Sequence, residues 1–237
     1  MNGKSYWRVG ALAILAACVA MPSVASAESK VSGKVSFEGT PPKRRKIRMD
    51  ADPVCAASHD DAVLGEEVVV GDDGGLQNVF VYVPDVKGDF PPPSDPAVID
   101  QKGCHYEPHV VGVQVGQPVQ ILNSDKTLHN VHGMPKVNPG FNFAMPKFVK
   151  KKDHQFDSVE TMVAVKCDVH PWMSSYIGVV SNPFFAVTGP DGTFEIDGLP
   201  PGDYTIQAWQ EKLGTQEAKV SVAADGTSTV DFTFKES

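Results

Sequence analysis

Apolar residues in this chain fall into short segments that either alternate with polar residues or are rich in β-branched and aromatic residues. Asn78–Val83 and Val119–Leu122 are examples, and turns such as Gly116-Gln117-Pro118 and Pro190-Asp191-Gly192 separate segments of this kind. Successive side chains of a strand point to opposite faces of a sheet, so the pattern predicts half-buried strands that end at these turns. Helical periodicity is weak after residue 27. We therefore predict an all-β fold built from β-sandwiches.

The N-terminus has the features of an export signal. Two basic residues precede an apolar core, Val9–Ala20, and a small-residue cleavage site follows at Ala25-Ser26-Ala27. The core is too short to span a bilayer. We predict a signal peptide over residues 1–27 and a periplasmic or secreted protein, with a lipoprotein anchored at Cys18 as the alternative. We expect no transmembrane segment after cleavage.

Charge limits the partners of the exported chain. Without Lys4 and Arg8, residues 28–237 carry 19 basic and 29 acidic residues, a formal net charge of −10. Nucleic acid and anionic membranes are poor partners for such a protein. The basic cluster from Lys147 to Lys152 would suit a negatively charged redox partner, although it would equally keep an exposed loop soluble.

One short segment concentrates metal-binding side chains. Cys167, His170 and Met173 form a C-x₂-H-x₂-M motif, and His129 lies 38 residues earlier. A thiolate, two imidazoles and a weak thioether are the ligands of a mononuclear blue-copper electron-transfer site. The motif therefore predicts one type 1 copper ion held by these four residues.

Other interpretations of the motif fit less well. Structural zinc would leave Met173 unused, a dinuclear copper centre needs a second Cys in the loop, and no haem attachment motif is present. A free buried Cys167 beside two structural histidines is the alternative without a metal. His132 lies three residues after His129, so on a strand it would point to the opposite face, and we leave it outside the ligand set.

Proline clusters suggest the domain boundaries. Phe90-Pro91-Pro92-Pro93-Ser94-Asp95-Pro96 and Asn182-Pro183 enclose residues 97–181, which hold all four predicted ligands. The run from Phe194 to Ile206, with Gly198-Leu199-Pro200-Pro201-Gly202 at its centre, resembles carboxypeptidase regulatory-like (transthyretin-like) β-sandwich domains, as does the opening from Val31 to Pro41. This resemblance implies a nested arrangement in which residues 30–90 and 182–236 build one sandwich. The alternative is a C-terminal hairpin packed on a single sandwich.

Residues 97–181 resemble the cupredoxins, and most closely those of the amicyanin type. The similar segments are Val119–Asn123, His129–His132 and the short loop from Cys167 to Met173, with Pro after its second ligand. The resemblance implies a Greek-key β-sandwich in which His129, Cys167, His170 and Met173 bind copper. It further implies that Asn123 braces the cysteine loop from outside the ligand set.

Two cysteines remain in the exported chain. Cys55 and Cys104 predict a disulfide, because paired cysteines of exported proteins are usually bridged. A second metal site that includes His59, His105 and His109 is the alternative.

We considered three functions: a diffusible electron carrier, a copper-binding or delivery protein, and an interaction module without metal. No Ser-His-Asp set, phosphate loop or additional copper motif points to an enzyme. For an electron carrier we expect His170 to be the solvent-facing ligand. A redox partner would then dock near His170 and Trp172, on an apolar patch that includes Pro171. The same patch would extend to the apolar residues Phe141, Phe143 and Met145.

Overall fold

The computed structural model describes Met1 and residues 29–236. The predicted signal peptide and the alternative lipid-attachment site at Cys18 therefore lie outside the described residues. Across the described part of the chain, no helix is both long and apolar enough to cross a membrane.

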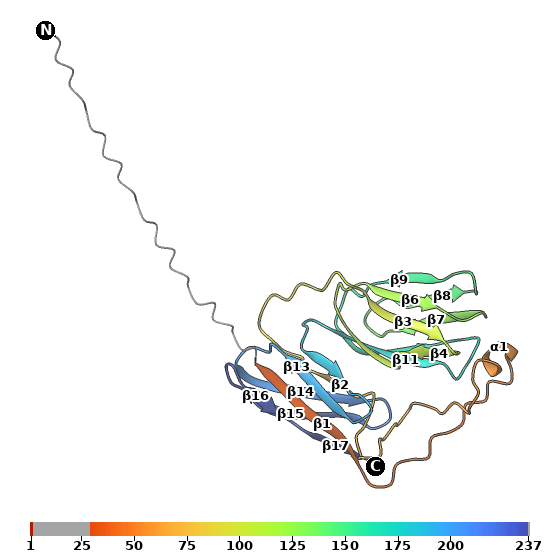
Figure 1. Ribbon diagram of the computed structural model, residues 1–237, viewed down its shortest axis with the longest axis horizontal. Coiled ribbons are helices and arrows are strands. Elements are labelled where there is room, and N and C mark those ends of the chain that lie inside the picture. The colour runs from red at the N-terminus through yellow and green to blue at the C-terminus, as the bar shows by residue number, and fades with distance from the viewer. Residues whose placement is uncertain (2–28, 237) are drawn as a thin grey trace.

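The all-β fold class predicted from the sequence is confirmed: two β-sandwiches lie side by side, and the chain has one short helix in its described part (Figure 1). The strands of the central sandwich are β3 Ala97–Lys102, β4 His105–Glu107, β5 Val110–Gln114, β6 Val119–Asn123, β7 His129–Met134, β8 Phe141–Met145, β9 Lys151–His154, β10 Glu160–Lys166 and β11 Ser174–Val180. The other elements are β1 Lys30–Glu38, α1 Pro53–Ala56, β2 Phe80–Tyr82, β12 Phe185–Val187, β13 Thr193–Asp197, β14 Gly202–Gln210, β15 Gly214–Val222, β16 Thr227–Thr229 and β17 Phe232–Lys235.

The central sandwich has one sheet with the strand order β5-β11-β10-β7-β8 and a second with the order β4-β3-β6-β9. The alternating burial of β6, in which Val119, Ile121 and Asn123 are buried, matches the alternation in the sequence. The buried residues of both sheets form one cluster that also contains Cys167 and Met173. This core continues to the end of the sandwich where the metal-binding motif lies.

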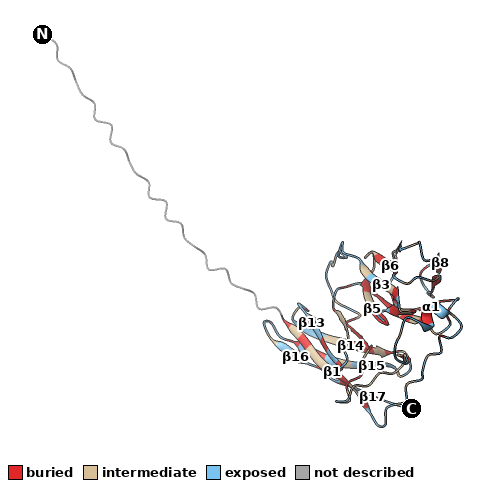
Figure 2. Ribbon diagram, turned by 45° about the vertical axis from the view of Figure 1, so that its right-hand side comes forward, coloured by how far each residue is buried: buried red, intermediate tan, exposed pale blue. Residues whose placement is uncertain are grey.

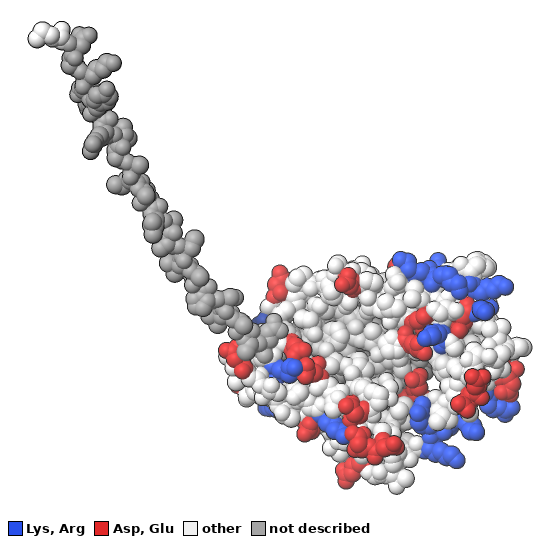
Figure 3. All heavy atoms as spheres, viewed as in Figure 1, with Lys and Arg blue, Asp and Glu red and all other residues white. Residues whose placement is uncertain are grey.

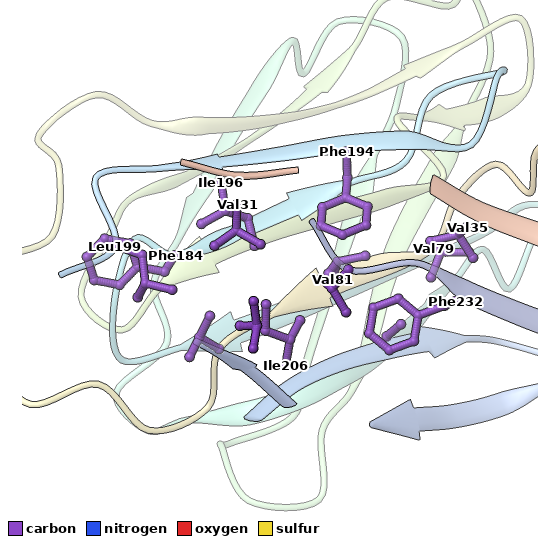
Figure 4. Packing of buried hydrophobic residues seen from close by; sticks show 14 of the residues in the cluster. Val31, Val35, Val79, Val81, Phe184, Phe194, Ile196, Leu199, Ile206 and Phe232 are labelled. Atoms are coloured by element: carbon purple, nitrogen blue, oxygen red, sulfur yellow. The ribbon is translucent and has the colours of Figure 1, made fainter. Parts of the chain in front are cut away.

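The second sandwich is assembled from both ends of the chain. β1 pairs antiparallel with β13 and parallel with β16 and β17, while β2 pairs with β12 and β14 in the opposite sheet. Side chains such as Val31, Val81, Phe194 and Ile206 fill the space between the two sheets (Figure 4). Residues from before and after the central sandwich therefore share one core.

The two sandwiches meet at a small aromatic cluster. Phe80 is fully buried and packs with Val110, Val180 and Phe185. A Cβ atom added to Gly112 or Gly178 would lie 2.6–2.7 Å from atoms of the Phe80 ring, so both central-sandwich strands need glycine here.

The expectation that residues 30–90 belong only to the second sandwich is wrong for residues 46–64, which we name the cap. Lys46 bridges to Leu64 at the base of the cap, and between them the chain carries α1 to the end of the central sandwich (Figures 1 and 2). Met49 and Cys55 are buried in the central core. The cap leaves the second sandwich because these side chains find their apolar contacts in the other one.

Candidate metal centre

The loop between β10 and β11 closes tightly on itself. The Cys167 amide donates to the Met173 carbonyl at 3.2 Å, the Met173 amide donates to the His170 carbonyl at 3.0 Å, and the His170 amide donates to the Cys167 sulfur at 3.3 Å. These contacts bring three predicted ligands into a single turn. All three side chains are buried, including the thioether of Met173 in the core cluster.

His129 begins β7 and reaches the loop from the neighbouring strand. Its Nδ1 lies 2.9 Å from Nδ1 of His170, which in turn lies 3.9 Å from the Cys167 sulfur. Donor atoms of His129, Cys167 and His170 all fall within 4.8 Å of one another. The structure thus brings these three residues together from positions up to 41 apart in the sequence, with Met173 at the end of the same loop.

The donor set fits copper. Two imidazole nitrogens that face each other at 2.9 Å must share a proton or a cation, because two lone pairs repel. A soft thiolate suits Cu(I), imidazoles suit both oxidation states, and a thioether is a common weak axial ligand. The four side chains therefore supply what a mononuclear copper site requires.

A carboxylate contacts the far nitrogen of each imidazole. Asp125 lies 2.8 Å from Nε2 of His129, and Asp52 lies 3.1 Å from Nε2 of His170. Burial lowers the pKa of His129, but the hydrogen bonds with Asp125 and Cys167 outweigh it and raise the pKa to about 9. For His170, burial prevails over the contact with Asp52 and lowers the pKa.

The predicted role of Asn123 in bracing the cysteine loop is wrong in the structure, since Asn130 performs it. The side-chain oxygen of Asn130 accepts hydrogen bonds from the Cys167 sulfur at 3.3 Å and from the Asp168 amide at 2.7 Å. Burial raises the pKa of Cys167, and the hydrogen bonds with His129 and the loop amides outweigh it and lower the pKa. These contacts therefore ease the loss of the thiol proton that metal binding requires.

Asn123 braces a different turn. Its side-chain amide donates to the carbonyls of Met145 and Thr127, at 2.7 and 3.3 Å, and its side-chain oxygen accepts from the Asp125 amide. It thus holds the turn that carries Asp125. Asn123 lies on β6 and Asn130 on β7, which follow each other in the chain but belong to different sheets. The packing of the sheets therefore decides which of the two contacts the cysteine loop.

The expectation of a solvent-facing His170 is also wrong. His170 is 2% exposed, because Asp52 and Cys55 of the cap cover its outer edge, with the Cys55 sulfur 3.7 Å from Nε2. Trp172 is partly buried, and its indole donates to the Cys104 carbonyl at 3.1 Å. These contacts make Trp172 a packing residue of the loop.

The rest of the expected apolar docking patch is only partly exposed. Phe141 and Met145 are buried in the central core, and Phe143 is half-buried against it. The reason is that β8 pairs with β7 at the edge of its sheet and turns these side chains inward.

The remaining histidines and cysteines lie outside the donor cluster. Cys55 and Cys104 are joined in a disulfide with a Cα–Cα distance of 5.6 Å. His132 lies 3.0 Å from Asp168, and His109 lies 3.0 Å from Glu211. Among the described residues, the groups of side chains arranged to hold a metal include none of His59, His105 and His109.

Two residues of the site, Asp52 and Asp125, were not identified from the sequence. Asp52-Pro53 is a helix-start signal, and Asp52 does cap α1 by accepting from the Val54 amide at 2.8 Å. Asp125 lies four residues before His129, in the loop after β6. The helix-start signal at Asp52 and the position of Asp125 are local features of the sequence. Neither indicates a contact with a predicted ligand.

Comparisons with known proteins give one family match and several similar solved structures. Residues 179–235 match the carboxypeptidase regulatory-like domain family. Among solved structures, a variant of amicyanin in its oxidised state is similar at 22% identity, covering 42% of this chain and 90% of that one, with a TM-score of 0.32. No match was found among curated protein sequences.

Two further copper proteins show a likeness of the same order. The copper-containing nitrite reductase of Thermus scotoductus SA-01 is 21% identical over 40% of this chain and 25% of that one, with a TM-score of 0.31. A purple cupredoxin from Nitrosopumilus maritimus is 22% identical over 35% of this chain and 98% of that one, with a TM-score of 0.29.

Proposed function

We propose that this protein is an exported type 1 copper protein that carries single electrons between redox partners, without catalysis of its own. The observation that carries the proposal is the convergence of Nδ1 of His129, Nδ1 of His170 and the sulfur of Cys167 at the buried end of a β-sandwich. Met173, on the same loop, is the fourth proposed ligand. Copper would supply a one-electron redox couple.

The surrounding residues support this chemistry by holding the donors rigidly. The hydrogen bond from the His170 amide to the Cys167 sulfur, and the one from the Asp168 amide to the Asn130 side-chain oxygen, hold the loop in place before and after an electron moves. Burial of all four side chains keeps water from the metal. A site that rearranges little between two oxidation states suits electron transfer.

Export is part of the proposal. The disulfide between Cys55 and Cys104 is typical of proteins that leave the reducing cytosol. It agrees with a signal peptide over residues 1–27 and a periplasmic or secreted location.

Both histidines are buried, and the cap occupies the surface over His170, so we propose that a redox partner docks at the exposed side chains that neighbour His129. Leu128, next to His129, is 45% exposed, and Phe148 is 78% exposed. The Lys150 ammonium donates to the Asp125 carbonyl at 3.3 Å, which brings the basic cluster to this face. Basic side chains gather over β9 and the adjoining loops (Figure 3). An acidic protein with a small apolar contact would fit this surface.

The test is the colour of the copper-loaded protein. Wild type should show an intense visible thiolate-to-copper band, and Cys167→Ser should lose it while far-UV circular dichroism is retained. His129→Ala should also lose the band. The matched control His132→Ala removes a partly exposed imidazole of the same strand and should keep it.

Each other outcome points to a different function. Colour retained in Cys167→Ser would place the copper elsewhere and overturn the assignment. A colourless protein that binds only Cu(I) would support copper storage or delivery. A protein that binds no copper would support an interaction module built on the two sandwiches.

A further inference from the structure

We propose that Asp52 and Asp125 are positioning residues of the metal centre, each holding one histidine ligand with Nδ1 turned toward the metal. The inference rests on the proposed function and extends it to a second layer of residues. Their paired negative charge would favour the metal in its higher oxidation state.

Asp125 is held rigidly against His129. One of its oxygens accepts from the Gly103 amide, and the other accepts from the Cys104 amide, both at 2.8 Å. Gly103 and Cys104 have positive φ angles, 60° and 57°, which turn their amides toward the same carboxylate. The oxygen bound by Cys104 also lies 2.8 Å from Nε2 of His129.

Asp52 is held as firmly against His170, although it comes from the cap. Its Oδ1 caps α1 at the Val54 amide, while Oδ2 accepts from the Thr127 hydroxyl at 2.8 Å and lies 3.1 Å from Nε2 of His170. The side chain is 18% exposed, so the contact is largely shielded from water.

The two carboxylates form a connected unit. The disulfide joins Cys55, three residues after Asp52, to Cys104, whose amide binds Asp125. Thr127, on the turn after Asp125, binds Asp52. The cap is therefore coupled to both sides of the centre by a covalent bond and a hydrogen bond.

The chemistry follows from the two nitrogens of an imidazole. A carboxylate that accepts a hydrogen bond from Nε2–H keeps the ring in the tautomer whose Nδ1 lone pair is free for a metal. It also makes the ring a better donor, and losing such a partner typically weakens metal binding about 10- to 100-fold. With the Cys167 thiolate, the two carboxylates place three negative charges around the centre, which stabilises Cu(II) relative to Cu(I).

The experiment compares Asn and Ala variants at both positions. Asp→Asn removes the charge but keeps an acceptor oxygen, and Asn caps a helix as well as Asp does, so Asp52→Asn should leave α1 intact. Asp→Ala removes both the charge and the acceptor oxygen. Asp61→Asn, an exposed position of the same cap, is the matched control.

We expect Asp52→Asn and Asp125→Asn each to raise the reduction potential of the copper protein and to weaken Cu(II) binding more than Cu(I) binding. The Ala variants should weaken binding of both ions by about 10- to 100-fold. The control should match wild type, and circular dichroism of the metal-free variants should show that each has folded.

Zinc binding and nitrogen NMR separate this inference from the proposed function. In the Zn(II)-loaded wild type, both rings should carry a proton on Nε2, and the Ala variants should lose that signal or its protection from exchange. This result is expected whether or not the copper form is coloured. Potentials and Zn(II) affinities that stay at wild-type values in folded Ala variants would overturn the positioning role.

Discussion

The protonation of His129 should set how the metal affinity of the candidate centre depends on pH. The contacts of this ring with Asp125 and Cys167 raise its pKa to about 9, so the ring is charged at neutral pH in the metal-free protein. A metal ion that binds Nδ1 must displace the proton that this nitrogen carries in the charged ring. His129, a proposed ligand, would therefore also make the metal affinity depend on pH.

We predict that the apparent affinity for copper rises with pH by about tenfold per unit from near neutrality and levels off above pH 9. The sign follows because a raised pKa keeps the metal-free ring protonated below pH 9, and each ion bound there releases a proton. Calorimetry in two buffers of different ionisation enthalpy would count the protons. Binding at pH 7.5 without proton release would contradict the assignment of His129.

At the scale of elements, the cap is the feature that sets this centre apart from a bare loop at the end of a sandwich. It carries α1 away from the second sandwich and returns through the Lys46–Leu64 bridge. Its disulfide closes a separation of 49 residues and holds Asp52 at the metal centre. The cap replaces solvent at the outer edge of His170.

Replacing both Cys55 and Cys104 with Ala should lower the free energy of unfolding by roughly 2–5 kcal/mol, because the unfolded chain gains the freedom of a long loop. Denaturant titration would measure the loss, and hydrogen exchange should show faster opening of residues 46–64. The central strands β6 and β11 serve as the internal control and should keep their protection. Alkylation of two free thiols in the native oxidised protein would contradict the disulfide itself.

At the scale of the whole molecule, the two sandwiches are coupled because the central sandwich is inserted in the sequence between the strands of the second sandwich. Phe80 of the second sandwich fills the space that Gly112 and Gly178 leave open on the central sheet. Unfolding of one sandwich would expose this face of the other. We expect the two sandwiches to unfold as one unit.

Phe80→Ala should therefore destabilise both sandwiches together, by about 3–5 kcal/mol, the usual cost of emptying a buried aromatic site. The described residues include one tryptophan in each sandwich, Trp172 and Trp209, so single-tryptophan variants would report on each separately. Coincident denaturation curves that shift together are the expected result. A shift seen only at Trp209 would mean that the sandwiches are independent.

The basic face beside His129 should control the rate at which anionic reactants reach the centre. Lys126→Glu, two residues before the exposed Leu128, should slow oxidation of the Cu(I) protein by ferricyanide and weaken the dependence of the rate on salt. Lys235→Glu, on β17 of the other sandwich, is the control. Equal slowing by both variants would indicate an effect of net charge and would argue against this docking surface.

Several of these features are written in short stretches of sequence. The alternation in segments such as Val119–Leu122 predicts strands, because strand geometry links neighbouring residues directly. The C-x₂-H-x₂-M spacing requires its three donors to share a loop, whatever the rest of the fold does. The pairing of Cys55 with Cys104 followed from the sequence once Cys167 was assigned to the metal, with a second metal site left open as the alternative.

Other features depend on contacts between residues that are distant in the sequence. Asp52 and His170 are 118 positions apart, and Lys30 of β1 and Glu195 of β13, which form an ion pair, are 165 apart. The choice between Asn123 and Asn130 as the brace of the cysteine loop, and the burial of His170 beneath the cap, follow from how the sheets stack and where the cap packs. The sequence by itself determined which chemical groups are present and which of them share a turn. Only the tertiary structure decided which carboxylate meets which imidazole and that all four predicted ligands are buried, because these features arise from the packing of whole elements, which local sequence patterns do not specify.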